Sequence, residues 1–425
     1  MSPDFSHIVL AVTVGVSILL MLVRPRNIPE VYWVSGGALL LLILRLIPLK
    51  LAGKAIAEGS DVYLFLIGMM LLSALANEQG LFEWVSSAAV RGARGSSARL
   101  FTLVYGIGTL TTIFMSNDAT AVVLTPAILT AVRKAKVEPL PHLFACALIA
   151  NAASFVLPIS NPANLVVFHT GMPPLGRWLV SFGLPSVLSI VSTYFVMRLV
   201  FRADLQAAID AEVEDCSLTA GGKLVLAGLA CMILVLLTAS AFDKDLGLPS
   251  CIAALLVTVV VAVKEKSNPL KLAKEVSWGT LLLVAGLFIM VDAVESIGAL
   301  RYTVDALHPA GRLAPAVGAT VIAFVVGVAN NLVNNLPLGL IAGATVKAAQ
   351  VKGLLANAVL IGVDLGPNLS VTGSLATILW LLALRKEKIE VSFWKFLKVG
   401  ALAMPAALLL SIGGAVLMNT LFHSK

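Results

Sequence analysis

Two short asparagine-rich segments interrupt long apolar stretches of the sequence, about half the chain apart. The first is SNDA at residues 116–119, and the second is NNLVNNLP at residues 330–337. Amides and carboxyl groups at membrane depth have no water to bond, so they must line a cavity or lie buried within protein. Two such breaks at matching places in two halves predict a transporter that binds a small polar solute at its centre.

Two further segments have the composition of broken helices. Residues 151–164 begin at an asparagine and end in ISNPAN, and residues 364–374 begin with DLGPN and end in a Gly-Ser pair. Proline removes backbone donors and glycine tolerates unusual dihedral angles, so each segment predicts half-helix ends that attract oxygen-rich solutes. We expect the four segments to converge. The predicted substrate-binding residues are Asn117, Ser160, Asn161, Asn164, Asn334, Asn335, Gly373 and Ser374.

Asp118 and Asp364 are the acidic residues of these segments. A carboxylate near the middle of a membrane costs about 2.5–3.5 kcal/mol even on the most lenient insertion scale, so both acids point to function rather than to structure alone. Removing a carboxylate from water favours its protonated form, which suits a group that binds and releases protons. The hypothesis is that Asp118, Asp364 or both carry a coupling proton.

The chemistry of the four segments favours a neutral substrate. Asparagine side chains both donate and accept hydrogen bonds, which suits a polyhydroxylated solute. None of the four segments contains lysine or arginine. A strongly anionic substrate such as phosphate or citrate is therefore less favoured, although helix ends can hold anions unaided.

Other kinds of chemistry find no support in the sequence. There is no Walker A sequence, no HExxH and no GxGxxG opening a helix after a strand, so we expect neither an enzyme nor a bound cofactor. The four cysteines, at positions 146, 216, 231 and 251, have spacings that fit neither a disulfide framework nor a metal site. The net charge of +7 is explained by basic membrane loops, so no nucleic-acid partner is expected.

Composition places the chain in a lipid bilayer. Of its 425 residues, 59% are apolar and only 12% are charged, whereas soluble domains have about 25% charged residues. Several apolar runs approach or exceed the roughly 20 residues that cross a membrane. The sequence therefore predicts an all-α, multi-pass membrane protein.

The two halves of the sequence resemble one another. Shifting the chain by roughly 213–218 positions pairs residues 66–69 with 284–287, Gly80 with Gly298, and residues 160–164 with 373–377. The same shift pairs Asn117 and Asp118 with Asn334 and Asn335, and Asn151 with Asp364. We expect a first repeat over residues 1–201, a cytoplasmic connector over 202–222, and a second, inverted repeat over 223–425.

Basic residues suggest how the repeats cross the membrane. If residues 100–133 and 314–346 each form a re-entrant hairpin, about two thirds of the lysines and arginines fall on one side, as the positive-inside rule requires. That side includes Arg24, Lys134, Arg202 and Arg385. The prediction is ten membrane-spanning helices plus two re-entrant hairpins, with both termini outside.

At the same four segments the sequence resembles the bacterial arsenite efflux permeases of the ion transporter superfamily. The most specific matches are NDA at 117–119 leading to LTP at 124–126, NNLP at 334–337, and DLGP at 364–367 followed by GSLATILW at 373–380. The similarity covers nearly the whole chain. ISN at 159–161, followed by Asn164, also matches the first broken helix of the family.

The resemblance implies proton-driven export of arsenite and antimonite across the inner membrane. It implies an inverted-repeat fold in which hairpins and broken helices move, in an elevator-like or rocking manner, against the remaining helices. Some members work with a soluble arsenite-stimulated ATPase. Members often have an acidic residue where this chain has Asn151, which leaves Asp118 and Asp364 as the acids of the site.

Arsenious acid is a neutral trihydroxide, so amides and hydroxyls can replace its hydration. Two alternatives share the architecture, namely a sodium/proton antiporter and a carboxylate transporter. A membrane enzyme is a third alternative, which the absence of a catalytic constellation disfavours.

Overall fold

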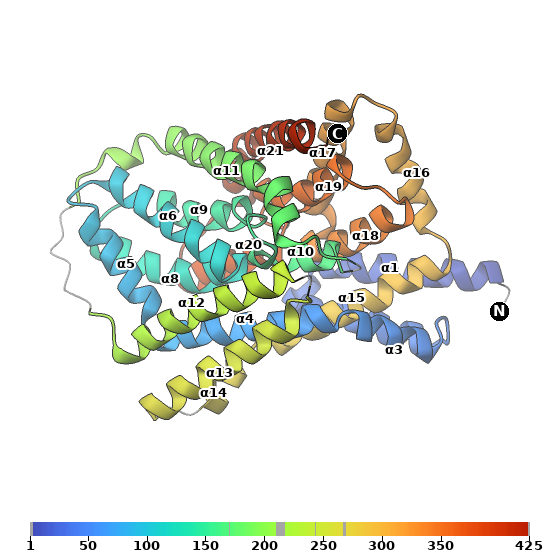
Figure 1. Ribbon diagram of the computed structural model, residues 1–425, viewed down its shortest axis with the longest axis horizontal. Coiled ribbons are helices and arrows are strands. Elements are labelled where there is room, and N and C mark those ends of the chain that lie inside the picture. The colour runs from blue at the N-terminus through green and yellow to red at the C-terminus, as the bar shows by residue number, and fades with distance from the viewer. Residues whose placement is uncertain (1–2, 170, 210–216, 243, 267–268, 424–425) are drawn as a thin grey trace.

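The computed structural model describes residues 3–169, 171–209, 217–242, 244–266 and 269–423, and its regular structure there is helical (Figure 1). The helices of the first half are α1 (Pro3–Val23), α2 (Glu30–Ile43), α3 (Leu49–Glu58), α4 (Ser60–Glu78), α5 (Leu81–Gly92), α6 (Ser97–Phe114), α7 (Asn117–Ala119), α8 (Thr125–Lys134), α9 (Pro139–Ala152), α10 (Pro162–Val167) and α11 (Leu175–Val200). Those of the second half are α12 (Ala220–Ala241), α13 (Gly247–Glu265), α14 (Pro269–Glu275), α15 (Trp278–Ser296), α16 (Leu300–Gly311), α17 (Pro315–Val333), α18 (Asn335–Ala348), α19 (Leu354–Leu365), α20 (Leu375–Lys386) and α21 (Phe393–His423). Five short turns join them, η1 (Pro25–Asn27), η2 (Thr120–Leu124), η3 (Pro158–Ser160), η4 (Asp204–Gln206) and η5 (Gly366–Asn368).

Helix length and composition confirm a multi-pass membrane protein. Eight helices of the described residues are long and apolar enough to cross a bilayer, namely α4, α6, α11, α12, α13, α15, α17 and α21. Shorter apolar helices include α1, α2, α9 and α19. The all-α fold class is therefore confirmed, whereas the count of ten spans plus two hairpins stays a prediction.

Elements follow one another in the same order in the two halves. In each half two helices, a short helix and a third long helix precede a twelve-residue helix, α5 or α16. Gly80 precedes α5 and Gly298 precedes α16, with φ angles of 72° and 70°. A left-handed turn costs glycine little, so the paired glycines place the same sharp turn at the same point.

Helices of one half pack against helices of the other. α4 lies along α13, and α2 lies along α15. Gly68 allows the first contact, because a Cβ there would stand 2.8 Å from the backbone of Ser250. Gly286 on α15 is in the same way pressed against Val34 on α2. Because glycine has no side chain, Gly68 and Gly286 let the helix backbones approach closely, as small residues do in membrane bundles.

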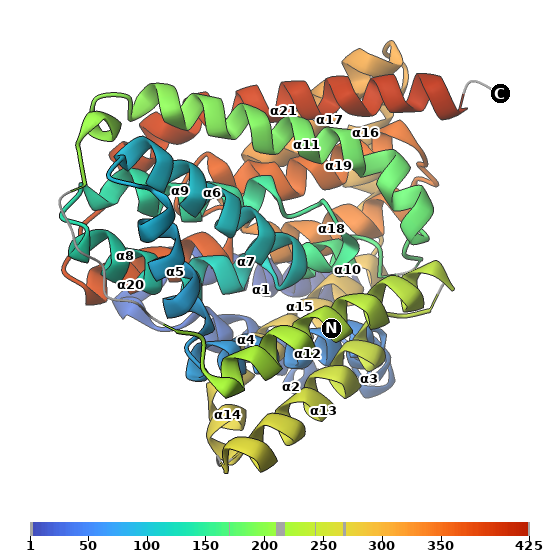
Figure 2. The ribbon, with the colours of Figure 1, turned by 60° about the vertical axis from the view of Figure 1, so that its left-hand side comes forward.

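The last helix of each half packs against its counterpart. α11 and α21 run side by side in both views (Figures 1 and 2) and make an extensive contact. The Ser411 hydroxyl donates a hydrogen bond to the Pro185 carbonyl oxygen (3.0 Å), and Gly414 fits closely over Leu188. This pair forms one wall of the molecule.

Each half contains a helix–break–helix segment. α6 stops at Phe114 and the chain resumes as α7, η2 and α8, while α17 stops at Val333 and resumes as α18. α5 packs against both α6 and α8, and α16 packs against both α17 and α18. Figure 2 shows α8 returning to the side of the molecule where α6 begins. The shape fits the predicted hairpins.

Candidate functional site

The first hairpin tip has one acid facing a cavity. Ser116 caps α7, since its side chain accepts a hydrogen bond from the Ala119 amide (3.2 Å). Asn117 is buried, and its Oδ1 has no hydrogen-bond partner among the described residues. Asp118 is half-buried and lines a large cavity. The tip therefore offers one accessible carboxylate and one buried, unused acceptor.

The second hairpin tip is neutral and strained. Asn334 has φ 77° and ψ 153°, a region that costs a residue other than glycine roughly 1–3 kcal/mol. Its Nδ2 donates weakly to the Thr372 carbonyl oxygen (3.5 Å). Asn335 is buried and its Oδ1 has no partner among the described residues. Asn331, one turn before, donates to Gly366 O (3.0 Å) and so ties the tip to η5.

The first broken helix unwinds between α9 and α10, where prolines begin both η3 and α10. Ser160 donates to the Ile113 carbonyl oxygen (3.0 Å), which joins the break to α6. Asn161 caps α10 by accepting from the Ala163 amide (3.0 Å). Asn164 donates to Ser154 O (2.8 Å), while its own Oδ1 stays without a partner among the described residues.

The second broken helix unwinds between α19 and α20. A Cβ at Gly373 would overlap Pro367 Cα and stand 2.8 Å from Asn331 Oδ1, so only glycine fits there. Ser374 caps α20 by accepting from the Thr377 amide (3.1 Å). Its hydroxyl is fully buried.

Hydrogen bonds cross between the two broken helices in a matched pattern. Asn161, which caps α10, donates to Asp364 Oδ1 at the end of α19 (2.6 Å). Ser374, which caps α20, donates to Asn151 Oδ1 near the end of α9 (3.4 Å). Asn151 in turn donates to Asn368 Oδ1 (2.9 Å). Each capping residue therefore bonds to a polar residue of the other half. Asn161 bonds to the acid Asp364, and Ser374 bonds to the amide Asn151, which is the matching position of the first half.

Asp364 is almost completely buried, with 1% of its surface exposed. Its Oδ1 accepts from Asn161, and the Ser154 side chain is a second polar neighbour of the carboxyl group, while Oδ2 has no close hydrogen-bond partner among the described residues. An isolated charged carboxylate would be very costly at such a place. The geometry therefore suits a carboxyl group that is protonated in this conformation.

A cavity of about 1000 Å³ reaches Asp118. Its lining residues come mainly from α4, α5 and α15 and from η2, α8 and α20. Along η2 and α8 it follows every fourth residue, from Asp118 through Val122, Pro126 and Thr130 to Lys134. Sixteen residues at the helical rise correspond to a length of about 24 Å. The residues that line it and carry charge are Arg24, Glu30, Glu83, Asp118, Lys134, Glu275 and Arg385.

A second, small hollow of about 20 Å³ adjoins the first at the tip of the second hairpin. It is lined by Asn334 and shares Arg24, Glu30 and Thr372 with the large cavity. The volume is enough for about one water molecule. Asp118 and Asn334 therefore line two neighbouring hollows that share part of their walls.

Not all predicted site residues line these hollows. Asp118 lines the large cavity and Asn334 the small hollow, while the other eight line neither, and hydrogen bonds join Asn161 to Asp364 and Ser374 to Asn151. Those eight are Asn117, Ser160, Asn161, Asn164, Asn335, Asp364, Gly373 and Ser374. Nearest neighbours in the sequence, such as Ser116, Pro162 and Thr372, line the cavity instead.

Several cavity residues were missing from the sequence-based set. Arg24, which follows α1, and Glu30, the first residue of α2, line both hollows, although the sequence predicts Arg24 only as part of a basic loop. Glu83 and Glu275 lie on the short helices α5 and α14. Their sole sequence signal is a charge placed beside an apolar run, which loop residues share.

Soft-metal chemistry finds no support in the described residues. They contain no cluster of three or more histidine, cysteine, aspartate or glutamate side chains placed to hold a metal. Cys146, Cys231 and Cys251 are free thiols and line neither hollow. Cys216 lies outside the described residues.

Comparisons with known proteins confirm the resemblance drawn from the motifs. Residues 9–363 match the family described as citrate transporter. The chain is 28% identical to an arsenical pump membrane protein of Yersinia enterocolitica over 83% of this chain and 85% of that protein. It is 26% identical to the arsenical pump membrane protein of Escherichia coli K12, with the same coverage. The YdaH transporter of Alcanivorax borkumensis shares the fold, with a TM-score of 0.59 and 16% identity over 88% of this chain and 87% of that one.

Proposed function

The chain belongs to the citrate transporter family, and we propose that it exports arsenite and antimonite from the bacterial cytoplasm, coupled to protons. It is a multi-pass protein of the inner membrane, and its similarity to arsenical pump membrane proteins supports transport of arsenicals across that membrane. The family and the relatives are transporters, which disfavours an enzyme.

One observation carries the proposal, namely the cavity that reaches Asp118. Residues with hydroxyl groups, such as Ser73, Ser116, Thr130 and Thr372, line it together with that carboxylate. Hydroxyl groups both donate and accept hydrogen bonds, so they can replace the water around a small neutral trihydroxide. The cavity carries charges of both signs, as suits a solute without charge of its own.

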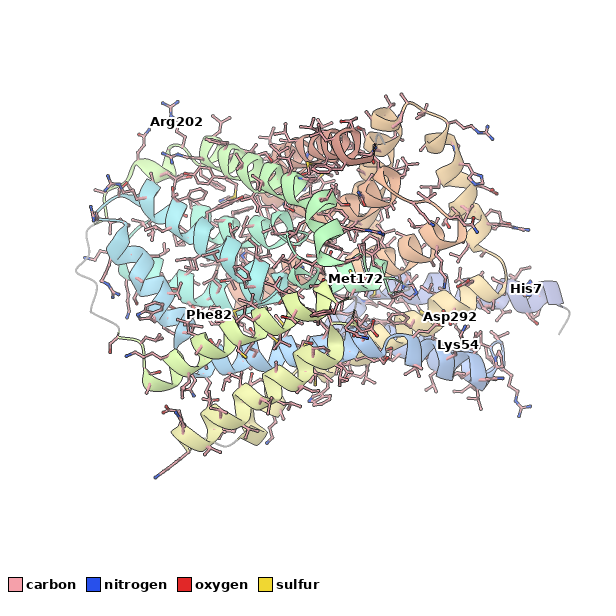
Figure 3. The ribbon with its side chains drawn as sticks, viewed as in Figure 1. His7, Lys54, Phe82, Met172, Arg202 and Asp292 are labelled. Carbon is pink, nitrogen blue, oxygen red and sulfur yellow. The ribbon has the colours of Figure 1, made fainter. Side chains whose placement is uncertain are left out.

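Orientation of the cavity favours export. Its far end is formed by Lys134 and Arg385, which the positive-inside rule assigns to the cytoplasm together with Arg202. Arg202 lies at one end of the molecule, and His7 and Lys54 lie toward the other (Figure 3). We infer an inward-open conformation, in which a solute from the cytoplasm can reach Asp118.

Asp118 and Asp364 are proposed to carry the coupling protons from two different places. Asp118 meets the solvent of the cavity, so it can exchange a proton and contact the substrate there. Asp364 meets Asn161 inside the protein, so a change in its proton should be coupled to movement of α10 against α19. The buried asparagines, with Ser160, Gly373 and Ser374, would then shape the site from behind.

The moving unit is proposed to comprise α6–α10 and α17–α20. Hydrogen bonds between the two broken helices hold these elements together, whereas α4 and α15 line the cavity with α8 and α20 and contact the unit through α10 and α18. Inverted repeats over residues 1–201 and 223–425, on either side of the connector 202–222, would allow this unit to occupy a pair of equivalent positions.

Arsenite accumulation in everted membrane vesicles tests the function. Vesicles containing the protein should accumulate arsenite and antimonite when their lumen is made acidic, because protons that leave the lumen exchange for substrate that enters it, and a protonophore should stop accumulation. Vesicles with the Asp118→Asn variant are the matched control. Uptake that follows a sodium gradient instead would support the antiporter alternative, and citrate uptake without arsenite uptake would support the carboxylate alternative; either result would overturn the proposal.

A soluble ATPase is a further proposed partner. The basic residues between 264 and 274 and between 91 and 99 are its proposed contacts on the cytoplasmic side. Retention of the arsenite-stimulated ATPase by the purified protein would support this, and its recovery in the flow-through at low salt would contradict it.

A further inference from the structure

We propose that the ion pair between Arg24 and Glu30 determines the charge of the substrate that this cavity accepts. The pair presents a neutral, hydrogen-bonding surface to a polyhydroxylated solute, and Glu30 keeps Arg24 from binding oxyanions. The inference rests on the proposed function, because it concerns how that site selects arsenite.

The pair lies where the two hollows meet. Arg24 Nη2 lies 2.7 Å from Glu30 Oε2, and 23% and 15% of the two side chains are exposed. Both residues line the large cavity, and both line the small hollow against Asn334. The ion pairs Lys54–Glu58 and Arg133–Glu387 line neither hollow.

Local structure holds the two residues in place. Arg24 ends α1 in the left-handed conformation, with φ 46°, and Pro25 follows, which prevents the helix from continuing. The chain reverses through η1, and Glu30 becomes the first residue of α2. Glu30 therefore stands at the N-terminus of α2, where the helix dipole attracts a carboxylate.

The chemistry of an arginine depends on whether it is paired. A free guanidinium binds carboxylates, phosphates and arsenate through two parallel hydrogen bonds. Here a carboxylate already occupies that geometry, so an anion must displace Glu30 and face its repulsion. A neutral hydroxide can instead donate to Glu30 and accept from Arg24 without breaking the balance of charge. In this chain, such pairing would favour a neutral solute over an anion.

Glu30→Gln tests the proposal, because it unpairs Arg24 while keeping a side chain of the same size. Binding of arsenate, phosphate and citrate to the purified variant is measured by thermal stabilisation, and inhibition of arsenite uptake is measured in everted vesicles. The anions should bind at least about tenfold more tightly to the variant than to the parent protein, as a gained charge-assisted pair would cause. Arg24→Gln added to Glu30→Gln should remove the gained binding.

Glu83→Gln is the matched control, since it removes another carboxylate from the same cavity. If Glu83→Gln gains the same anion binding, the effect is one of total charge and the proposal is wrong. It is equally wrong if folded Glu30→Gln protein binds anions no better than the parent.

A second variant keeps the proposal testable if the first does not fold. Glu30→Asp shortens the carboxylate by one methylene and breaks the 2.7 Å contact, so it should gain a fraction of the anion binding. If Glu30→Gln does not accumulate, a folded Glu30→Asp protein without that gain overturns the proposal. Anion binding needs no transport, so a parent protein that exports no arsenite would defeat the proposed function and leave this test standing.

Discussion

Each half of the chain contributes a hairpin tip and a broken helix to the site, but the acidic residue lies on a different one of these two elements in each half. In the first half the hairpin tip carries Asp118, and the broken helix carries the amide Asn151. In the second half the tip is neutral at Asn335, and the broken helix carries Asp364. One acid faces the cavity and the other is buried against Asn161.

This difference separates two tasks that a coupled transporter needs. A carboxyl group in contact with water can exchange a proton without movement of the protein. A carboxyl group closed off by an asparagine can exchange one only when the contact opens, because a bare charge is so costly there. Matched backbone positions therefore do not imply matched chemistry.

The largest effect should come from removing the acid at the cavity. We expect Asp118→Asn to lower proton-driven arsenite uptake by everted vesicles at least about tenfold, equivalent to about 1.4 kcal/mol. The substitution keeps the size of the side chain and removes the exchangeable proton. Asp305→Asn, at an exposed position on α16, is the control and should leave uptake unchanged. Gradient-driven uptake by Asp118→Asn at the parent rate would remove this acid from the mechanism.

The second comparison concerns the breaks themselves. Gly373→Ala places a methyl group against Pro367 and Asn331 and should destabilise the protein by about 1–3 kcal/mol. The matched position in the first half holds Ser160, so the first break has room for a side chain where the second has none. Thermal unfolding in detergent measures the effect. Gly183→Ala on α11, where a Cβ meets nothing within 4 Å, should not lower the melting temperature.

The third comparison concerns the two helix caps. Asn161→Ala should cost about 1–3 kcal/mol, because it removes the 2.6 Å hydrogen bond to the buried Asp364 together with the cap of α10. Ser374→Ala loses a cap and a longer contact of 3.4 Å to a neutral amide, so its cost should be nearer about 1 kcal/mol. Melting temperatures of the two purified variants give the order. A larger loss for Ser374→Ala would show that the acid does not depend on its cap.

The smallest effect is expected at the cysteines of both halves. A variant with all four replaced should export arsenite at the parent rate, because Cys146, Cys231 and Cys251 line neither hollow. Resistance of arsenite-sensitive cells, corrected for the amount of protein in the membrane, measures the outcome. Lost resistance at normal abundance would mean that a thiol binds the substrate.

The fold and the four segments could be predicted from local chemistry. Apolar runs, prolines and the paired glycines Gly80 and Gly298 determine the structure of their own segments, so their effect can be predicted from the sequence directly. The difference in exposure between Asp118 and Asp364 could not be predicted, since it depends on which distant helices close around each carboxyl group. The position of Arg24 and Glu30 in the cavity wall could not be predicted for the same reason. A charged residue beside an apolar run indicates a loop as long as its neighbours in the fold are unknown.

The packing of helices of the first half against helices of the second has a consequence for biosynthesis. α4 is complete once the ribosome has passed residue 78. Its Gly68 packs against α13, however, and α13 ends only at residue 265. During that interval lipid or the insertion machinery must occupy the place of the missing helix. The first half therefore reaches its final packing only after much of the second has been translated, and the membrane-inserted nascent chain stays open until then.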